Sequence, residues 1–155
     1  MRTYWRQLVT KRSYVALVEG KLEKNEGKIT SWLTEDSRTA LVSSSPVDNG
    51  GQLAITNYKV LKESALQTDE ADLKTEYSLV ELNLETGRTN QIRVHMASMG
   101  HPVVGDRKYG NGNESSPIDR LCLHARVLEF IHPMTEKKVR FEAPMPKEFA
   151  RIFTQ

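Results

Sequence analysis

The chain has 155 residues, of which 38% are hydrophobic and 27% charged, so its composition excludes a disordered protein and its length predicts one domain. A single cysteine, Cys122, excludes an internal disulfide framework. No apolar stretch is long enough to cross a bilayer, and the first residues lack the pattern of a secretory signal. We therefore expect a soluble, cytoplasmic protein with no membrane partner.

The net charge of +2 is small, but the charges are unevenly distributed along the chain. Residues 1–28 and residues 86–155 each carry a net charge of +4, whereas residues 29–85 carry −6. A fold that brings the two ends together would create a positive face, which a phosphate backbone requires. Taken alone, the charge pattern favours the alternative, that these are solvated surface charges without a partner.

The first third of the chain predicts a helix end, one strand and two polar connections. Residues 1–9 fit the last turns of a helix, because their apolar side chains recur at helical spacing. Residues 13–19 form a nearly continuous apolar run that Gly20 ends, which is typical of a strand covered on both faces. Residues 21–27 are polar and resemble a turn, and residues 43–51 combine Pro, Asp, Asn and two Gly in a loop.

Four further strands are predicted in the rest of the chain. Residues 53–65 and 76–84 have the apolar pattern of two strands, joined by an acidic loop at residues 69–72. Residues 121–131 and 138–142 predict a closing pair of strands. Together with the helices, these elements predict an α+β fold with a mixed, mainly antiparallel sheet.

Two helices are predicted in the second half of the chain. One begins near Thr89, places Ile92 and Met99 on one side, and ends at Gly100. A short helix around Phe149 is predicted to close the chain.

The most informative segment is residues 85–110, which reads as a strand, a glycine turn and the start of a helix. Gly87 permits a backbone conformation that other residues avoid. A helix amino terminus attracts anions, and Arg88 and Arg93 flank this one with side chains suited to carboxylate or phosphate. Residues 106–110 form a basic, glycine-bounded loop that could follow a nucleic-acid backbone.

Three motifs in this order resemble the RluA-type RNA pseudouridine synthases, which convert uridines of ribosomal or transfer RNA to pseudouridine. The motifs are RSYVALVEG, TGRTNQIRVHMASMGHPVVGDRKYG and RLCLHARVLEFIHP. The resemblance extends from about Lys11 to Phe149, so the chain looks like the carboxyl-terminal part of that catalytic domain. One local departure is Asn90, where the family commonly has histidine.

The resemblance implies a role for several residues. Arg93 would hold and orient the nucleophilic aspartate, and Tyr14 would stack on the target base and transfer a proton at C5. The residues expected to contact RNA are Arg88, Thr89, Asn90, Gln91, Arg107 and Lys108. No metal or cofactor is expected. Without the resemblance, Tyr14 would be interpreted as a core residue and Arg93 as a surface charge.

The family's nucleophilic aspartate, in an H-R-L-D-R-type segment, is missing from the sequence. None of the six aspartates has that context: Asp36, Asp48, Asp69, Asp72, Asp106 and Asp119. We therefore expect the isolated chain to be inactive, and to self-associate because half a sheet leaves strand edges uncovered. A non-catalytic RNA-binding remnant and a plain interaction domain are the alternatives to part of an enzyme.

Overall fold

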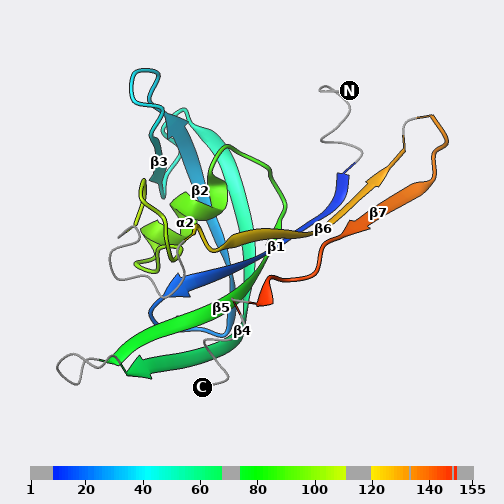
Figure 1. Ribbon diagram of the computed structural model, residues 1–155. Coiled ribbons are helices and arrows are strands. Elements are labelled where there is room, and N and C mark those ends of the chain that lie inside the picture. The colour runs from blue at the N-terminus through cyan, green and yellow to red at the C-terminus, as the bar shows by residue number, and fades with distance from the viewer. Residues whose placement is uncertain (1–8, 68–73, 111–119, 133, 148, 150–155) are drawn as a thin grey trace.

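The computed structural model describes residues 9–67, 74–110, 120–132, 134–147 and 149, which form one antiparallel sheet and one helix (Figure 1). The elements are β1 (Val9–Glu19), β2 (Glu26–Glu35), β3 (Val42–Ser45), β4 (Gln52–Gln67), β5 (Lys74–Leu84), α2 (Gln91–Ser98), β6 (Leu123–Ile131) and β7 (Lys138–Glu142). The strand order is β3-β2-β4-β5-β1-β6-β7, and every neighbouring pair is antiparallel. The predicted α+β class with a mainly antiparallel sheet is confirmed.

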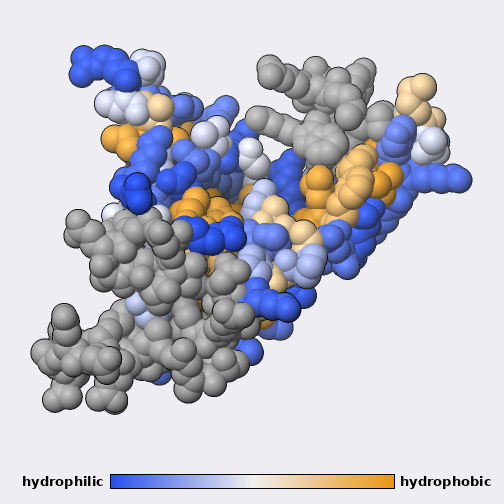
Figure 2. Space-filling view, in the orientation of Figure 1, coloured by the Kyte–Doolittle hydropathy of each residue, from blue (hydrophilic) through white to orange (hydrophobic). Residues whose placement is uncertain are grey.

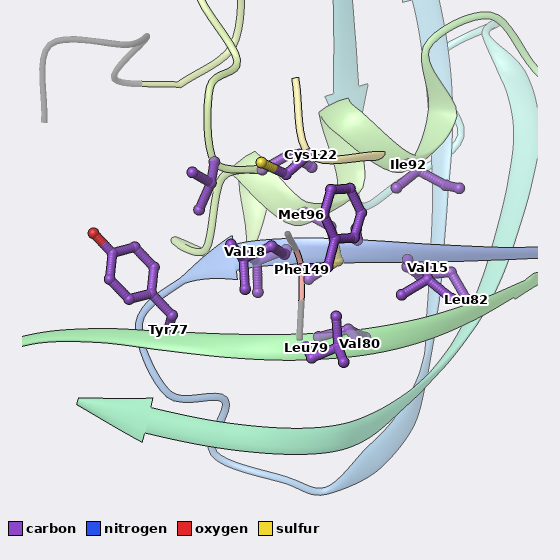
Figure 3. Packing of buried hydrophobic residues seen from close by; sticks show 14 of the residues in the cluster. Val15, Val18, Tyr77, Leu79, Val80, Leu82, Ile92, Met96, Cys122 and Phe149 are labelled. Atoms are coloured by element: carbon purple, nitrogen blue, oxygen red, sulfur yellow. The ribbon is translucent and has the colours of Figure 1, made fainter. Parts of the chain in front are cut away.

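The central strand β1 is buried on both faces, as its apolar run predicts. Val15, Ala16, Leu17 and Val18 are each 0% exposed. Successive strand residues point to opposite faces, so four consecutive buried residues require a cover on each side. The core cluster around β1 includes residues of β5 and α2, together with Phe149 near the carboxyl terminus (Figure 3).

The strands β2 and β3 were not predicted, and residues 43–45 lie in β3 and not in a loop. In β2 only Ser31 and Leu33 are buried, so the strand lacks the apolar alternation that reveals a strand in sequence. In β3 the sequence is VSSS, and Val42 is its only buried residue. Both strands are held by pairing with neighbours and not by local preference.

The predicted helix is present as α2, but it begins two residues later than expected. Asn90 precedes it with a φ of 55°, a left-handed conformation that prevents the helix from starting at Thr89. At the other end Gly100 has a φ of 85°, and the backbone N–H of His101 donates to the carbonyl of Met96. This left-handed glycine ends the helix as predicted.

Parts of three predictions lie outside the described residues. These are most of the helix at residues 1–9, of which Val9 begins β1, the acidic loop at residues 69–72, and most of the carboxyl-terminal helix. Within that last segment Lys147 and Phe149 are helical. Across the described residues, we find no helix with the length and hydrophobicity needed to span a membrane.

A buried polar cluster attaches α2 to the sheet. The imidazole of His95 lies 2.8 Å from the Ser31 hydroxyl on one side and 2.7 Å from the Thr56 hydroxyl on the other. The amide of Gln91 donates to the same Thr56 oxygen at 2.8 Å and to the carbonyl of Ile55 at 3.0 Å. Burial lowers the pKa of His95 to about 4, because the charged imidazolium would lose its hydration.

We predict that this histidine makes stability depend on pH. The unfolded chain binds the proton near pH 6.5 and the folded chain only near pH 4, so folding stability is complete above 6.5 and falls below it. The free energy of unfolding should decrease by about 3 kcal/mol between pH 6.5 and pH 4 through this group. Urea unfolding at several pH values measures this, and His95→Gln should flatten the curve over that interval. An equal slope in the variant would contradict the prediction.

Candidate functional site

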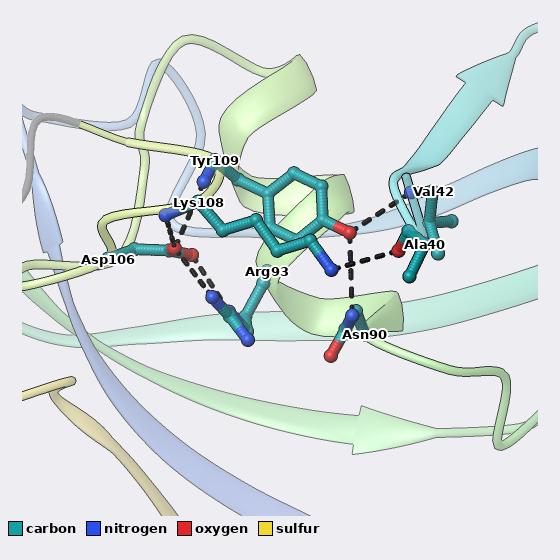
Figure 4. A network of polar contacts seen from close by, with 7 residues as sticks. All are labelled: Ala40, Val42, Asn90, Arg93, Asp106, Lys108 and Tyr109. Atoms are coloured by element: carbon teal, nitrogen blue, oxygen red, sulfur yellow. Dashed lines mark hydrogen bonds and ion pairs between the residues drawn. The ribbon is translucent and has the colours of Figure 1, made fainter. Parts of the chain in front are cut away.

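The site is built around an ion pair between α2 and the loop that follows it (Figure 4). Arg93 donates from Nε to Oδ2 of Asp106 at 3.0 Å and from Nη2 to Oδ1 at 2.8 Å. The side chain of Asp106 is 0% exposed and that of Arg93 is 21% exposed. The guanidinium also lies 5.2 Å from the ring centroid of Tyr109, within the range of a cation–π contact.

Asp106 is held by backbone groups as well. Its Oδ1 accepts the N–H groups of Lys108 and Tyr109, each at 3.0 Å. Burial raises the pKa of Asp106, but the hydrogen bonds from Arg93 and from these two N–H groups outweigh it and hold the pKa below its usual value. The same pairing raises the pKa of Arg93, so both groups are charged at neutral pH.

The loop at residues 106–110 also contacts the sheet near β3. The hydroxyl of Tyr109 accepts the N–H of Val42 at 3.0 Å and the side-chain amide of Asn90 at 3.4 Å. The Nζ of Lys108 donates to the carbonyl of Ala40 at 2.8 Å. The loop therefore joins the start of α2 to the turn before β3.

This arrangement gives Arg93 a partner that the sequence did not predict. We expected Arg93 to wait for a carboxylate from outside the chain and Asp106 to lie in a nucleic-acid-binding loop. The chain itself supplies a buried carboxylate for one edge of the guanidinium. The Nη1 group of Arg93 has no hydrogen-bond partner among the described residues.

Tyr14 lies on the face of the sheet that α2 covers. Thr56 bonds His95 and therefore faces the helix, and Tyr58, two residues along the same strand, shares that face. Tyr58 pairs with Leu82, and Leu82 pairs with Tyr14. The tyrosine is half-buried against the core. Its expected place in one cleft with the arginine stays a prediction.

Gln91, which we expected to contact RNA, is part of the interior. It is 2% exposed. Its oxygen accepts the Thr86 hydroxyl at 2.7 Å and the N–H of Arg88 at 3.0 Å, and both amide hydrogens are used in the bonds to the sheet described above. No donor or acceptor remains for a ligand, so Gln91 positions the turn before α2.

The other expected RNA contacts lie near the surface. Thr89 and Arg107 are exposed, and Arg107 makes no hydrogen bond or ion pair with the described part of the chain. Lys108 is exposed, and its Nζ donates to the carbonyl of Ala40 in the turn before β3. The Nε of Arg88 donates to the carbonyl of Leu53 at 2.9 Å, which fixes that side chain along β4.

Gly87 is needed because the Arg12 side chain packs closely against it, and not because of an unusual backbone angle. It does not have a positive φ. A Cβ at this position would lie 2.7 Å from Nη1 of Arg12, so the glycine lets the Arg12 guanidinium lie against the turn. Sequence reasoning missed Arg12 as a cation beside the start of α2, although it opens the RSYVALVEG motif.

A separate cleft of about 550 Å³ lies on the other face of β1. It is lined by Lys11, Ser13, Glu81, Arg126, Val127, Arg140, Glu142, Ala143, Pro144 and Met145. No residue that the sequence singled out lines it. Over the described stretches of chain, no three His, Cys, Asp or Glu residues are grouped so that they could hold a metal ion.

The family model for RNA pseudouridylate synthases matches residues 1–98, well over half of the chain. The chain belongs to this family. It is 42% identical over 142 residues to the uncharacterized RNA pseudouridine synthase YhcT of Bacillus subtilis, covering 92% of this chain and 43% of YhcT. It is 37% identical over 153 residues to the ribosomal large subunit pseudouridine synthase D of Zymomonas mobilis, covering 92% of this chain and 44% of that enzyme.

The fold agrees with this assignment. The structure of human RNA pseudouridylate synthase domain containing 1 superimposes with a TM-score of 0.72 at 30% identity, covering 91% of this chain and 56% of that one. The relatives confirm the RluA type that the motifs indicate. The chain spans a little under half the length of the two bacterial relatives above, whose names describe longer proteins.

We predict that Asp106 is a major contributor to stability. Asp106→Ala leaves Arg93 without its partner and two backbone N–H groups without an acceptor, and should lower the free energy of unfolding by about 3 kcal/mol. Asp106→Asn keeps an acceptor for the N–H groups and should cost less. Urea denaturation measures both, with the exposed neighbour variant Arg107→Gln as a control expected within about 0.5 kcal/mol of the parent. Equal stability of all three variants would refute this role.

Proposed function

We propose that this chain is the part of an RNA pseudouridine synthase that binds RNA and supplies Arg93 and Tyr14 to the reaction. The nucleophilic aspartate would come from a segment outside these 155 residues. One observation carries the proposal: Asp106 holds one edge of the Arg93 guanidinium while its Nη1 group stays unbonded among the described residues. The substrate would be a uridine in ribosomal or transfer RNA.

The guanidinium of Arg93 is already held in one orientation by Asp106. Binding the carboxylate of the nucleophile would therefore cost little further side-chain entropy. Arginine binds a carboxylate with two parallel N–H···O bonds, and its planar fork is always charged. Asp106 occupies Nε and one hydrogen of Nη2, which leaves the second hydrogen of Nη2 and both hydrogens of Nη1 as donors. A catalytic carboxylate bound there would be kept ionised and oriented.

The reaction needs an ionised carboxylate and an aromatic neighbour. The bond from uracil N1 to the ribose breaks, the base turns, and a bond from C5 to the ribose forms. The C5 proton leaves, and N1, which no longer bears the ribose, takes up a proton. A carboxylate can assist by attacking the sugar or the base. Tyr14, on the face that α2 covers, would stack on the uracil of a flipped-out nucleotide and accept or pass on the C5 proton.

The exposed cations around the site support RNA as the ligand. Arg12 lies against the turn before α2, and Arg107 is an exposed cation in the loop that follows the helix. Thr89 is exposed in the turn that leads into α2. Phosphate contacts of this kind position an RNA without reading its sequence.

A chimaera tests the proposal. This chain would replace the matching 44% of the Zymomonas mobilis ribosomal large subunit pseudouridine synthase D, and large-subunit rRNA from cells lacking that enzyme would be mapped for pseudouridine. We expect the chimaera to restore pseudouridine and the Arg93→Gln and Tyr14→Leu versions to lose it at least 100-fold. The exposed turn variant Glu23→Gln is the control that should retain it. A soluble chimaera that binds rRNA without forming pseudouridine would support a non-catalytic RNA-binding remnant instead.

The isolated chain should form no pseudouridine, because its 155 residues contain no aspartate in the nucleophile's motif. Release of tritium from RNA labelled at uridine C5 measures this directly. The chain should nevertheless bind the same RNA, with an affinity that falls as salt increases. Turnover by the isolated chain would show that another carboxylate can act as nucleophile.

A further inference from the structure

The two ends of the sheet are protected differently. At one end, the N–H of Val42 in β3 is bonded by the Tyr109 hydroxyl, and Lys108 bonds the carbonyl of Ala40 just before the strand. At the other end the strand order stops at β7, and no described residue bonds its outer backbone groups (Figure 1). An open edge strand is a template for pairing with another strand.

The hydrogen bonds at each end of β7 show which of its groups point outward. The carbonyl of Lys137 accepts the N–H of His132, and the N–H of Ala143 donates to the carbonyl of Arg126, so both residues face β6. In an antiparallel ladder the backbone groups of every second residue point the same way. The N–H and C=O groups of Lys138, Arg140 and Glu142 therefore point away from the sheet.

One face of β7 is apolar and exposed. Phe141 is 59% exposed, and its ring stacks on Phe130 of β6 with centroids 6.0 Å apart. The cross-strand pairs Leu128–Phe141 and Phe130–Val139 put four apolar side chains on this face. Hydrophobic atoms gather along this arm of the molecule in the space-filling view (Figure 2).

We propose that β7 pairs antiparallel with β7 of a second copy of this chain, about a two-fold axis that passes through Phe141. The outward groups of Arg140 would then form a hydrogen-bonded pair with Glu142 of the partner subunit, and the same pair would occur again by symmetry. The two Phe141 rings would meet in the closer, non-hydrogen-bonded position between them.

The charges of β7 select this register. Opposite charges face each other twice, Arg140 against the partner's Glu142 and the reverse, and cross-strand pairs of this kind stabilise a sheet. A shift of the axis to Arg140 would place two arginines opposite each other, which is unfavourable. In the single chain Arg140 already forms ion pairs with Glu142 and Glu129. The charges of the dimer would therefore add little to the free energy of association, which would come mainly from the backbone hydrogen bonds and the contact between the two Phe141 rings.

The contact is short, so we expect weak association. A five-residue strand with one exposed phenylalanine lies at the small end of specific interfaces, below about 1,200 Å² of buried surface. Sedimentation velocity of the nuclease-treated chain should show a monomer at about 10 μM and a growing dimer fraction towards about 1 mM. A monomer throughout this range, or a dimer that nuclease removes, would overturn the proposal.

A charge exchange tests the register. Glu142→Arg places arginines opposite each other, and Arg140→Glu places glutamates opposite each other, so each variant alone should dimerise at least 10-fold more weakly. An equimolar mixture of the two restores opposite charges at both positions and should recover dimers. The exposed turn variant Glu23→Arg, with the same change of charge, should dimerise like the parent. Variants that dimerise like the parent, or a mixture that stays monomeric, would overturn the proposal.

Two further measurements keep the result clear. Phe141→Ala should weaken the dimer at least 5-fold without changing any charge, and unaltered dimerisation would contradict the register. Far-UV circular dichroism checks that each variant is folded, because Arg140→Glu also removes a partner of Glu129. None of these assays uses RNA or catalysis, so their failure would leave the proposed function standing.

Discussion

The buried carboxylate of Asp106 is the constraint on which the site depends. A carboxylate with no exposed surface must be paired, and here a guanidinium and two backbone N–H groups provide the pairing. Meeting that requirement fixes Arg93 on α2 and closes the loop at residues 106–110 over β3. The pairing of one buried group thus joins α2 to the loop that follows it, and that loop contacts the distant segment at the start of β3.

The sheet sets where this pair can lie. α2 does not rest on an apolar stripe alone, because His95 and Gln91 are buried among hydroxyl groups of β2 and β4. Such contacts have a defined geometry, which apolar packing lacks, so they fix the rotation of the short helix about its axis. This rotation turns Arg93 towards the loop. Tyr14 lies on the face of the sheet that the helix covers.

The chain belongs to the RNA pseudouridylate synthase family, and its 155 residues contain no aspartate in the motif of that family's nucleophile. The chain covers less than half of YhcT and still folds as a full sheet with its own core. We propose that Arg93 and Tyr14 form one side of the site, whose acid would come from a segment outside these 155 residues. At the β3 end of the sheet the N–H of Val42 is bonded by Tyr109, whereas no described residue bonds the outward backbone groups of β7.

Much of the fold could be predicted from local patterns. The apolar runs indicated β1, β4, β5, β6 and β7, and spacing with a final glycine indicated α2. The polar strands β2 and β3 gave no such signal, because pairing with neighbours and not apolar alternation holds them in place. The site motif identified Arg93, yet neither its partner Asp106 nor the burial of Gln91 could be inferred from residue type.

The sequence by itself determined the family, the antiparallel α+β architecture and the absence of the nucleophile's motif, since these depend on residue identity and short-range periodicity. Only the tertiary structure decided which groups are paired. An aspartate in a basic, glycine-bounded loop resembles a solvated charge until the fold removes its water, and then it must take the nearest cation. The burial of a side chain depends on how the whole chain folds. Only the folded structure could therefore show which charged side chains are buried in ion pairs and which are exposed to solvent.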